Sequence, residues 1–364
     1  MQQWVELRLG GAGEVYPDSA AAVLHAHWDG WTAHVSLASP NQVSSGNVLA
    51  AIAAAALAVH EAFGIFNNRP GRDDGYRDIH LDLWSSIPGT ASQPAPDLAW
   101  APTRWWLIGL GHLGQANAWV LAWLLAGHPA AEIVLQDDAV ISAANRSTGV
   151  FATPVDVGLR KTRLTAAHLE RAGLATRIIE QRFDANAPVP ASQQRHVALF
   201  GVDNLDVRRS ISRSSFELSL DAGLGTGPGT FDSILIHRFP GGVDSNQVPS
   251  WRPELGPIAI PDTPAFAALR QQHDICGVTE LAGTAVGAAF VGLTAAVLTV
   301  TEALRASHGG ASLSLLRVDL ATVQPVGAPA RQTVEPPAER LPQARSLLDA
   351  DLVPVQEGTE RRSG

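Results

Sequence analysis

The sequence predicts an α/β fold: a Rossmann-like, mostly parallel sheet with flanking helices, plus a smaller N-terminal α/β segment. Between residues 104 and 239 short apolar runs alternate with helical stretches, as parallel strands and their crossover helices do. A buried strand at 104–108 runs into a Gly-x-Gly-x-x-Gly turn at 109–114. A Pro-, Ser- and Thr-rich linker at 88–102 closes the N-terminal segment, residues 1–100.

Composition and charge exclude several classes of protein. With 46 % hydrophobic residues the chain can bury a sizeable core, and its net charge of −9 argues against a nucleic-acid binder. The single cysteine, Cys276, leaves no internal disulfide and no zinc site built on cysteine pairs. The first residues show no basic region followed by an apolar run, so we expect no signal peptide and a cytoplasmic protein.

One uncharged run, residues 281–301, is long enough to span a membrane, which takes about 20 apolar residues. It is rich in Ala, Gly, Val and Thr and therefore only weakly hydrophobic, and Glu280 and Glu302 bracket it. We expect a buried helix here and no membrane partner.

Two parts of the chain resemble each other. Residues 54–63 and 295–304 are identical at six of ten aligned positions, and each run precedes a strand with an Asp-Leu pair, at 82–83 and 319–320. We therefore predict that residues 1–100 are a partial copy of the C-terminal helix–strand unit. The alternative is that two alanine-rich helices look alike by composition.

The glycine-rich turn indicates a nucleotide site. Gly109, Gly111 and Gly114 permit a tight turn and let backbone N–H groups approach a phosphate, and the N-terminus of the following helix favours an anion. His112 within the turn is expected to be an exposed loop residue. The turn alone does not say which nucleotide binds.

Acidic residues follow the next predicted strand, residues 132–135. Asp137 or Asp138 can accept hydrogen bonds from a ribose. The strand–turn–helix–strand–Asp order makes the nucleotide site a stronger prediction than the glycines alone, although dinucleotide-binding oxidoreductases carry the same order.

Three charged residues further along the chain indicate which chemistry the site performs. Of the 26 Lys and Arg residues only one is a lysine, Lys161, and a compact ammonium suits a tight phosphate better than a planar guanidinium. Arg146 adds positive charge, and Asp203, at the end of a predicted parallel strand, can hold Mg²⁺. Hydride transfer needs none of these groups. Attack of a carboxylate on an α-phosphate needs them, because negative charge grows and pyrophosphate must leave.

The motifs in chain order are Gly-x-Gly-x-x-Gly at 109–114, the acidic residues after the second strand, Asn-Arg at 145–146, Val-Gly-x-x-Lys at 157–161, Asp-Asn-x-x-x-Arg at 203–208 and, more loosely, Asp-Ala-Gly-x-x-Gly at 221–226. In this order they resemble the ThiF/MoeB-like adenylyltransferases, relatives of the ubiquitin-activating enzymes, over roughly residues 104–321.

The resemblance implies roles for individual residues. Arg146 and Lys161 would contact the ATP phosphates, and Asp203 would bind Mg²⁺. Asp137 or Asp138 would hold the ribose, and the same site would include the glycines of the turn together with Asn145 and Asn204.

The sequence departs from this family at several points. Gln136 stands where the first of two aspartates is usual, and the Asn-Arg element is shortened to residues 145–147. The paired cysteines of many members are absent, and position 226 is Thr226. These departures indicate a divergent, bacterial-type branch.

Cys276 is the only sulfur nucleophile available. Family members that form a thioester or pass sulfur carry a cysteine in a comparable loop before a helix, where the helix dipole would favour its thiolate. His273 could act as a nearby base. The alternative is that Cys276 is a small buried apolar residue, the usual fate of a single cysteine.

The sequence thus predicts an ATP- and Mg²⁺-dependent adenylyltransferase at residues 104–325, followed by a loosely ordered tail at 326–364. The carboxylate would be the C-terminus of a small ubiquitin-like or sulfur-carrier protein, or of a peptide, and a thioester on Cys276 could follow. As partners we expect a homodimer, or internal pairing with residues 1–100. The alternatives are a catalytically inactive scaffold of the same fold and an NAD-dependent oxidoreductase.

Overall fold

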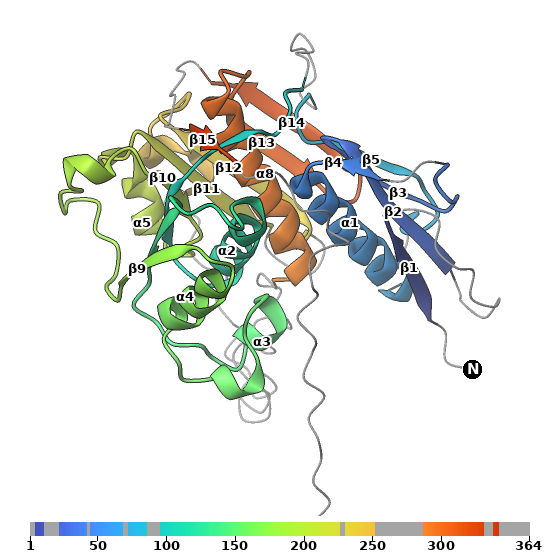
Figure 1. The fold of residues 1–364 in the computed structure, drawn as a ribbon, viewed down its shortest axis with the longest axis horizontal. Helices are drawn as coiled ribbons and strands as arrows, with labels where there is room; N and C mark the ends of the chain where they lie inside the picture. The colour runs from blue at the N-terminus through green and yellow to red at the C-terminus, as the bar shows by residue number, and fades with distance from the viewer. Residues whose placement is uncertain are drawn as a thin grey trace, which may run out of the picture.

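The computed structural model describes residues 4–10, 22–41, 44–67, 72–85, 95–225, 230–251, 287–330 and 338–341. These residues form a large and a small β-sheet, with α1 and α8 packed against each other between the two (Figure 1). The α/β fold with a mostly parallel sheet and flanking helices, expected from the sequence, is confirmed.

The large sheet has eight strands. In spatial order they are β14 (Gln324–Pro329), β13 (Leu313–Asp319), β12 (Ser233–Phe239), β11 (Leu218–Leu224), β10 (Val197–Phe200), β7 (Arg104–Ile108), β8 (Glu132–Gln136) and β9 (Ala175–Ile179). The strands from β11 to β9 are parallel, and β12, β13 and β14 extend the sheet in antiparallel fashion. Every residue of β10 is buried, as suits a parallel strand covered on both faces.

The strand order places a crevice beside β7. The chain runs from β7 outward through β8 and β9, then returns to the other side of β7 as β10. At such a switch point the segments that leave the carboxyl ends of the two central strands diverge, and ligands of open α/β sheets bind there. The glycine turn follows β7, and Asp203 follows β10.

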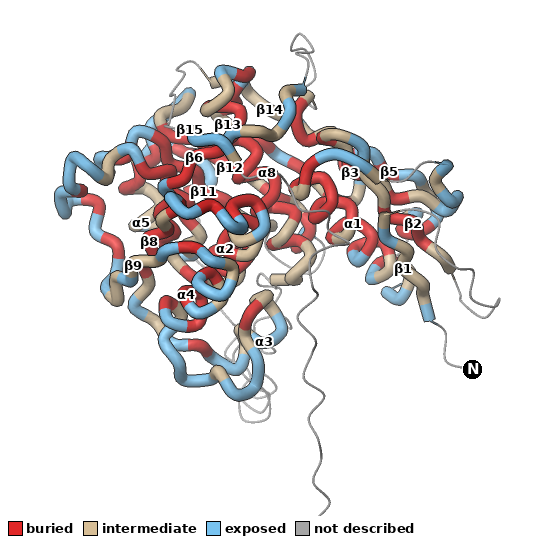
Figure 2. The backbone as a smooth tube through the Cα atoms, viewed as in Figure 1, coloured by how far each residue is buried: buried red, intermediate tan, exposed pale blue. Residues whose placement is uncertain are grey.

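Helices cover both faces of the large sheet. They are α2 (His112–Leu124), α3 (Asn145–Thr148), α4 (Lys161–Arg171), α5 (Leu205–Ser210) and α8 (Ala289–Ser307), with 3₁₀ turns at Pro154–Asp156, Ala191–Gln193, Ile211–Arg213, Ser245–Gln247 and Pro249–Trp251. Figure 2 shows buried residues, in red, along much of α1 and α8. One apolar cluster runs from the small sheet through α1 and α8 to the large sheet, and a second lies around Trp106, Phe200 and Trp251. The first cluster therefore joins the two sheets into one core.

The small sheet is the N-terminal segment. Its strands are β1 (Val5–Leu9), β2 (Ala22–Gly30), β3 (Thr32–Ser36) and β5 (Ile79–Asp82), with β4 (Ser45–Gly46) beside β2, and α1 (Val48–Asn67) packs on one face. A separate pair joins β6 (Trp100–Pro102) to β15 (Ala338–Arg340).

Two short parts of the predicted tail, residues 326–364, are paired into sheets. β14 forms a hairpin with β13, the strand just before it in the chain, and β15 pairs with β6, which lies far earlier in the chain. The expectation of loose order is therefore wrong for these two strands. The pairing of β15 could not be read from local sequence, because its partner is distant.

Two four-strand units share one topology. In the pairs β1/β2, β2/β3 and β3/β5 the strands run parallel, antiparallel and antiparallel, and β10/β11, β11/β12 and β12/β13 repeat that order. In each unit a long helix, α1 or α8, lies between the third strand and the fourth along the chain. Each fourth strand ends in an aspartate, Asp82 or Asp319, whose carboxylate accepts backbone N–H groups of the next turn. Duplication remains a prediction, and this repeated arrangement is what it would produce.

Each unit donates arginine hydrogen bonds to the other across the α1–α8 contact. Arg77, which follows α1, donates to the carbonyls of Leu320 and Ala321, just after β13. Arg305 of α8 donates to the carbonyl of Leu83, just after β5. The two contacts are reciprocal, like those of an isologous dimer interface within one chain.

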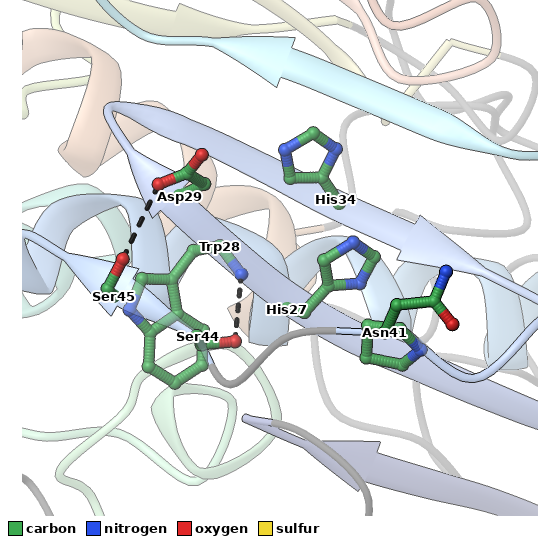
Figure 3. Close-up of a pocket in the computed structure, with 8 residues that line it drawn as sticks. His27, Trp28, Asp29, His34, Asn41, Ser44 and Ser45 are labelled. Carbon is green, nitrogen blue, oxygen red and sulfur yellow. Dashed lines mark hydrogen bonds between the residues drawn. The ribbon is translucent and has the colours of Figure 1, made fainter.

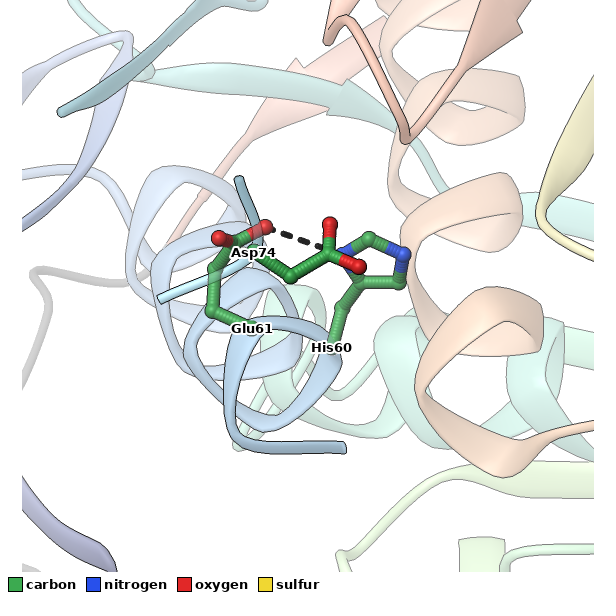
Figure 4. Close-up of side chains that lie close together, drawn as sticks. All are labelled: His60, Glu61 and Asp74. Carbon is green, nitrogen blue, oxygen red and sulfur yellow. Dashed lines mark hydrogen bonds and ion pairs between the residues drawn. The ribbon is translucent and has the colours of Figure 1, made fainter. Parts of the chain in front are cut away.

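A buried ion network lies at the same junction. Figure 4 shows His60 and Glu61 of α1 beside Asp74, close enough for one metal ion. His60 Nε2 lies 3.1 Å from Asp232 Oδ2, Arg72 pairs with Asp74 at 2.9 Å, and Arg77 pairs with Glu61 at 2.7 Å. Because arginines already neutralise these carboxylates, the cluster is a structural ion network that joins the units.

Helices α1 and α8 are long and apolar enough to cross a membrane by composition alone, and most of each lies inside the protein. The helix expected at 281–301 is described from Ala289 onward and is buried there, like the core helix of a globular domain.

Candidate functional site

Backbone atoms approach each other closely in the glycine turn, except at its tip, Gly111. Gly109 has a φ of +80°, and its N–H donates to the Gln136 carbonyl at 2.9 Å. A Cβ on Gly114 would lie 1.9 Å from the Gly109 carbonyl oxygen, and one on Gly201 would lie 2.9 Å from the Gly114 nitrogen. Among the described residues, no atom lies within 4 Å of a Cβ placed on Gly111. Two glycines thus let β7, α2 and β10 approach closely, and the third leaves the tip open for a ligand.

Of the two predicted ribose ligands, Asp137 is the one that meets the turn. Its carboxylate accepts the N–H of Leu110 at 2.6 Å and that of Ala139 at 2.7 Å. Asp138 is exposed, and its carboxylate lies 3.5 Å from Nε of Arg182. Geometry therefore favours Asp137 for contact with a nucleotide on the turn.

Helix α3, which carries Arg146 and Asn145, is held beside the start of α2. Gln115 of α2 is fully buried and accepts the Phe151 N–H at 3.2 Å. A Cβ on Gly149 would lie 2.4 Å from Gln115 Oε1, so the glycine is needed for this close approach. The Asn145 side chain accepts the N–H of Ser142, which fixes the turn that leads into α3.

Lys161 begins α4 next to the strand-end aspartates. Its N–H donates to the Ala139 carbonyl at 3.2 Å, and Arg160 forms an antiparallel bridge with Val140. The segment before α4 is therefore folded back onto the residues that follow β8. This places the only lysine on the β8 side of the glycine turn.

Asp203 lies on the other side of the turn, after β10. It is exposed and comes two residues after Gly201, whose backbone touches the turn. Asn204 caps α5, because its side-chain oxygen accepts the N–H groups of Asp206 and Val207. Whether Lys161 and Asp203 meet on one phosphate group remains a prediction.

The three predicted charges share one property. Within the described residues, Arg146, Lys161 and Asp203 have no ion pair and no hydrogen bond to their charged groups. Cys276 and His273 lie outside the described residues. The side chains of Arg146, Lys161 and Asp203 therefore have no ionic or hydrogen-bonded partner among the residues that the structure describes.

Arg208 and Asp221 form a buried pair that sequence reasoning had quoted within motifs but given no role. Arg208 Nε lies 3.1 Å from Asp221 Oδ1, without the alignment of a hydrogen bond, and Arg208 also donates to the Ala222 carbonyl at 2.7 Å. Burial raises the pKa of Asp221 to about 7, and Arg208 opposes this only in part. Two motif residues thus tie α5 to β11.

The expectation for His112 is wrong. This residue begins α2 and is half-buried, with its Nε2 3.0 Å from the Ala288 carbonyl oxygen. Cβ atoms on Gly287 or Gly292 would lie within 2.4 Å of its ring. Burial lowers the pKa of His112 to about 4, so its ring is neutral and links the turn to the start of α8.

Comparison with known proteins gives two family matches and one curated relative. The family models described as the BilD C-terminal and N-terminal domains match residues 101–310 and 1–83. The chain is 36 % identical over 308 residues to the bacterial E1-like protein BilD of Collimonas sp. (strain OK412), which covers 82 % of this chain and 66 % of that protein. The chain thus spans slightly less than two thirds of its relative.

Among solved structures, three of E. coli MccB are similar over part of the chain. They contain MccA-N7isoASN, succinimide, and AMPCPP with MccA, and they cover 64 %, 62 % and 65 % of this chain and 65 %, 63 % and 66 % of theirs. Their identities are 14 %, 14 % and 15 %, with TM-scores of 0.41, 0.41 and 0.39.

Proposed function

The chain belongs to the BilD family of bacterial E1-like proteins, and on that premise we propose that it is an ATP-dependent adenylyltransferase. The observation that carries the proposal is the glycine turn, with space at Gly111 among the described residues, between segments that carry Arg146 and Lys161 after β8 and Asp203 after β10. Membership of an E1-like family and charges of both signs on the segments after β8 and β10 fit nucleotide activation better than hydride transfer.

The proposed roles follow from position. Backbone N–H groups at the turn and the start of α2 hold the phosphates. Lys161 and Arg146 neutralise the charge that grows on the α-phosphate and on the leaving pyrophosphate. An oxygen of the acceptor carboxylate attacks the α-phosphorus, the bond to the bridging oxygen of the β-phosphate breaks, and an acyl-adenylate remains.

Asp203 is the proposed magnesium ligand. Mg²⁺ prefers carboxylate and phosphate oxygens, and Asp203 offers an exposed carboxylate with no partner among the described residues. When bound, the ion would supply further charge neutralisation for the phosphates. Asp137 would hold the ribose, because it already lies against the turn.

The proposed acceptor is the C-terminal carboxylate of a ubiquitin-like or sulfur-carrier protein, or of a peptide, which is the kind of substrate that an E1-like enzyme activates. We further propose that Cys276 receives the acyl group as a thioester and releases AMP. In that case Cys276→Ser should abolish a thiol-sensitive adduct with the acceptor and leave adenylation intact. An adduct that persists in Cys276→Ser would assign this cysteine a structural role.

Pairing is proposed to be internal. The face of α8 that another copy of the domain could use is occupied by α1, with reciprocal arginine contacts. We therefore favour pairing with the N-terminal unit over a homodimer through α8.

ATP–pyrophosphate exchange in the presence of candidate acceptors tests the function. Lys161→Ala and Asp203→Ala should each abolish exchange. Lys161→Arg should restore little of it, because a planar guanidinium group does not fit where a compact ammonium contacts a phosphate. Arg163→Ala and Asp206→Ala are matched controls from α4 and α5, since both residues form exposed ion pairs with the protein. Full exchange in Lys161→Ala or Asp203→Ala would refute the assignment. Absence of ATP binding by calorimetry would favour a scaffold, and binding of NAD without ATP would favour an oxidoreductase.

A further inference from the structure

Three histidines form a row across the small sheet. His27 of β2 lies directly opposite His34 of β3, and His34 lies directly opposite His80 of β5. Because side chains alternate between the two faces of a strand, all three project from the face opposite α1, against which Leu24 and Ala26 are buried. A quarter of the chain's 12 histidines thus stand side by side on one surface.

Their ring nitrogens are close and incompletely bonded. His34 Nδ1 lies 2.7 Å from His80 Nδ1, the distance of a hydrogen bond in which one ring donates the proton and the other accepts it. The His27 and His34 rings stack with centroids 4.7 Å apart. His27 Nδ1 is buried and has no hydrogen-bond partner in the described part of the chain. A buried ring nitrogen without a partner costs free energy unless something binds it.

A hollow opens beside the row. Its volume is about 340 Å³, and it is lined by His27 and His34 together with Asp29, Asn41, Ser44 and Ser45 (Figure 3). Asp29 is exposed and stands on the same strand two residues from His27, so its carboxylate projects from the same face. The hollow gives a small ligand access to the imidazoles from solvent.

The three side chains are of a type that transition metal ions prefer. Neutral imidazoles carry free lone pairs and are the commonest protein ligands of zinc, copper and nickel. In the cluster around His60, arginines pair with the carboxylates and leave no need for a metal ion. Among the described residues, no arginine is paired with the three rings of the row.

We propose that His27, His34 and His80 bind a first-row divalent transition metal ion, with Zn²⁺ as the test ion. The ion replaces the proton of the hydrogen bond between His34 and His80. At zinc–nitrogen distances of about 2.0–2.1 Å, tetrahedral ligand nitrogens lie about 3.3 Å apart, so these two rings need to separate by only about 0.6 Å. In the structure the three rings do not yet bring one nitrogen each within 4.8 Å of one another, as the His60, Glu61 and Asp74 group does. The His27 ring therefore has to turn to bring in its nitrogen without a partner, and water or Asp29 completes the coordination.

Calorimetric titration with ZnCl₂ tests this site on the full chain after treatment with a chelator and dialysis. We expect one Zn²⁺ per chain and a loss of affinity of about tenfold or more in each of His27→Gln, His34→Gln and His80→Gln. His168→Gln is the matched control. His168 belongs to α4, which packs against the large sheet, and its ring stacks on Phe151. Circular dichroism verifies that each variant is folded, and His80 is exposed, so its replacement leaves the core intact.

X-ray absorption of the zinc-loaded protein should show three nitrogen ligands at about 2.0–2.1 Å. The proposal is overturned if the native chain takes up no stoichiometric Zn²⁺, or if any of the three row variants binds as tightly as the native protein. Zinc binding is measured independently of ATP–pyrophosphate exchange, so the proposed metal site and the proposed adenylyltransferase activity are tested separately.

Discussion

Glu61 of α1 and Glu302 of α8 make the same two bonds on opposite sides of the helix contact. One oxygen of Glu61 accepts the Gly75 N–H at 2.6 Å, and the other accepts Arg77 at 2.7 Å. One oxygen of Glu302 accepts the Leu313 N–H at 2.6 Å, and the other accepts Arg305 at 2.7 Å. Each glutamate thus orients the arginine that reaches into the other unit.

Removing either glutamate should destabilise the whole protein. Glu61→Ala removes the nearest carboxylate partner of Arg77, leaving the longer contact with Asp74, and leaves Gly75 without an acceptor; breaking a buried pair costs about 3–5 kcal/mol. Glu302→Ala should cost a similar amount, as measured by urea unfolding followed by circular dichroism. The control Glu217→Ala removes an exposed pair with Arg195 and should cost less than about 1 kcal/mol. Equal effects of all three substitutions would contradict the structural role of the buried pairs.

Acid should weaken the junction through Glu61. Burial alone would raise the pKa of this carboxyl, but hydrogen bonds from His60, Arg77 and the Gly75 N–H outweigh burial and lower it to about 2. A depressed pKa means that the stabilisation is complete above pH 4.5 and is lost as the pH falls toward 2, on the order of 3 kcal/mol in all. Free energies of unfolding measured between pH 2 and 6 should show this slope, and Glu61→Gln should flatten it. An unchanged slope in Glu61→Gln would refute the assignment.

Alkali should weaken the same junction through His60. Burial opposes its charge, but hydrogen bonds to Asp232 and Glu61 outweigh burial and raise its pKa above 6.5. A raised pKa means that the stabilisation is complete below pH 6.5 and disappears as the pH rises through the value in the folded protein. Thermal unfolding midpoints between pH 6 and 9 should fall more steeply in the native protein than in His60→Gln. Parallel curves for the two proteins would show that His60 does not titrate as described.

Two glycines of the same turn should respond differently to substitution. Gly114→Ala places a methyl group where the Gly109 carbonyl oxygen stands, and we expect a loss of about 1–3 kcal/mol in stability. The methyl group of Gly111→Ala meets no atom of the described residues, so stability should stay within about 1 kcal/mol of the native value. Its methyl group projects into the proposed phosphate position, so ATP affinity by calorimetry should fall. Native ATP affinity in Gly111→Ala would place the phosphates elsewhere.

Local patterns allowed much of the fold to be predicted from the sequence. The strand at 104–108, the glycine turn and the helix after it are encoded by consecutive residues, and the structure has them there. The likeness of residues 54–63 and 295–304 likewise pointed to two helices that share a topology.

Partners far apart along the chain explain what could not be predicted. Strand β15 pairs with the distant β6, and His112 is covered by residues that come 175 or more positions later, at Gly287 and beyond. The histidine row needs the register of three strands, and neither His27 nor His80 has a local pattern that would reveal it.

The reciprocal arginine contacts end on main-chain oxygens. Because every residue type supplies such an oxygen, substitutions at Leu83, Leu320 or Ala321 can alter packing without removing the acceptors. The residues of the turns after β5 and β13 can therefore change during evolution while Arg77 and Arg305 still donate hydrogen bonds to the main chain there. Evolutionary constraint on the joint between the halves should accordingly rest on these two guanidinium groups and on the glutamates that orient them.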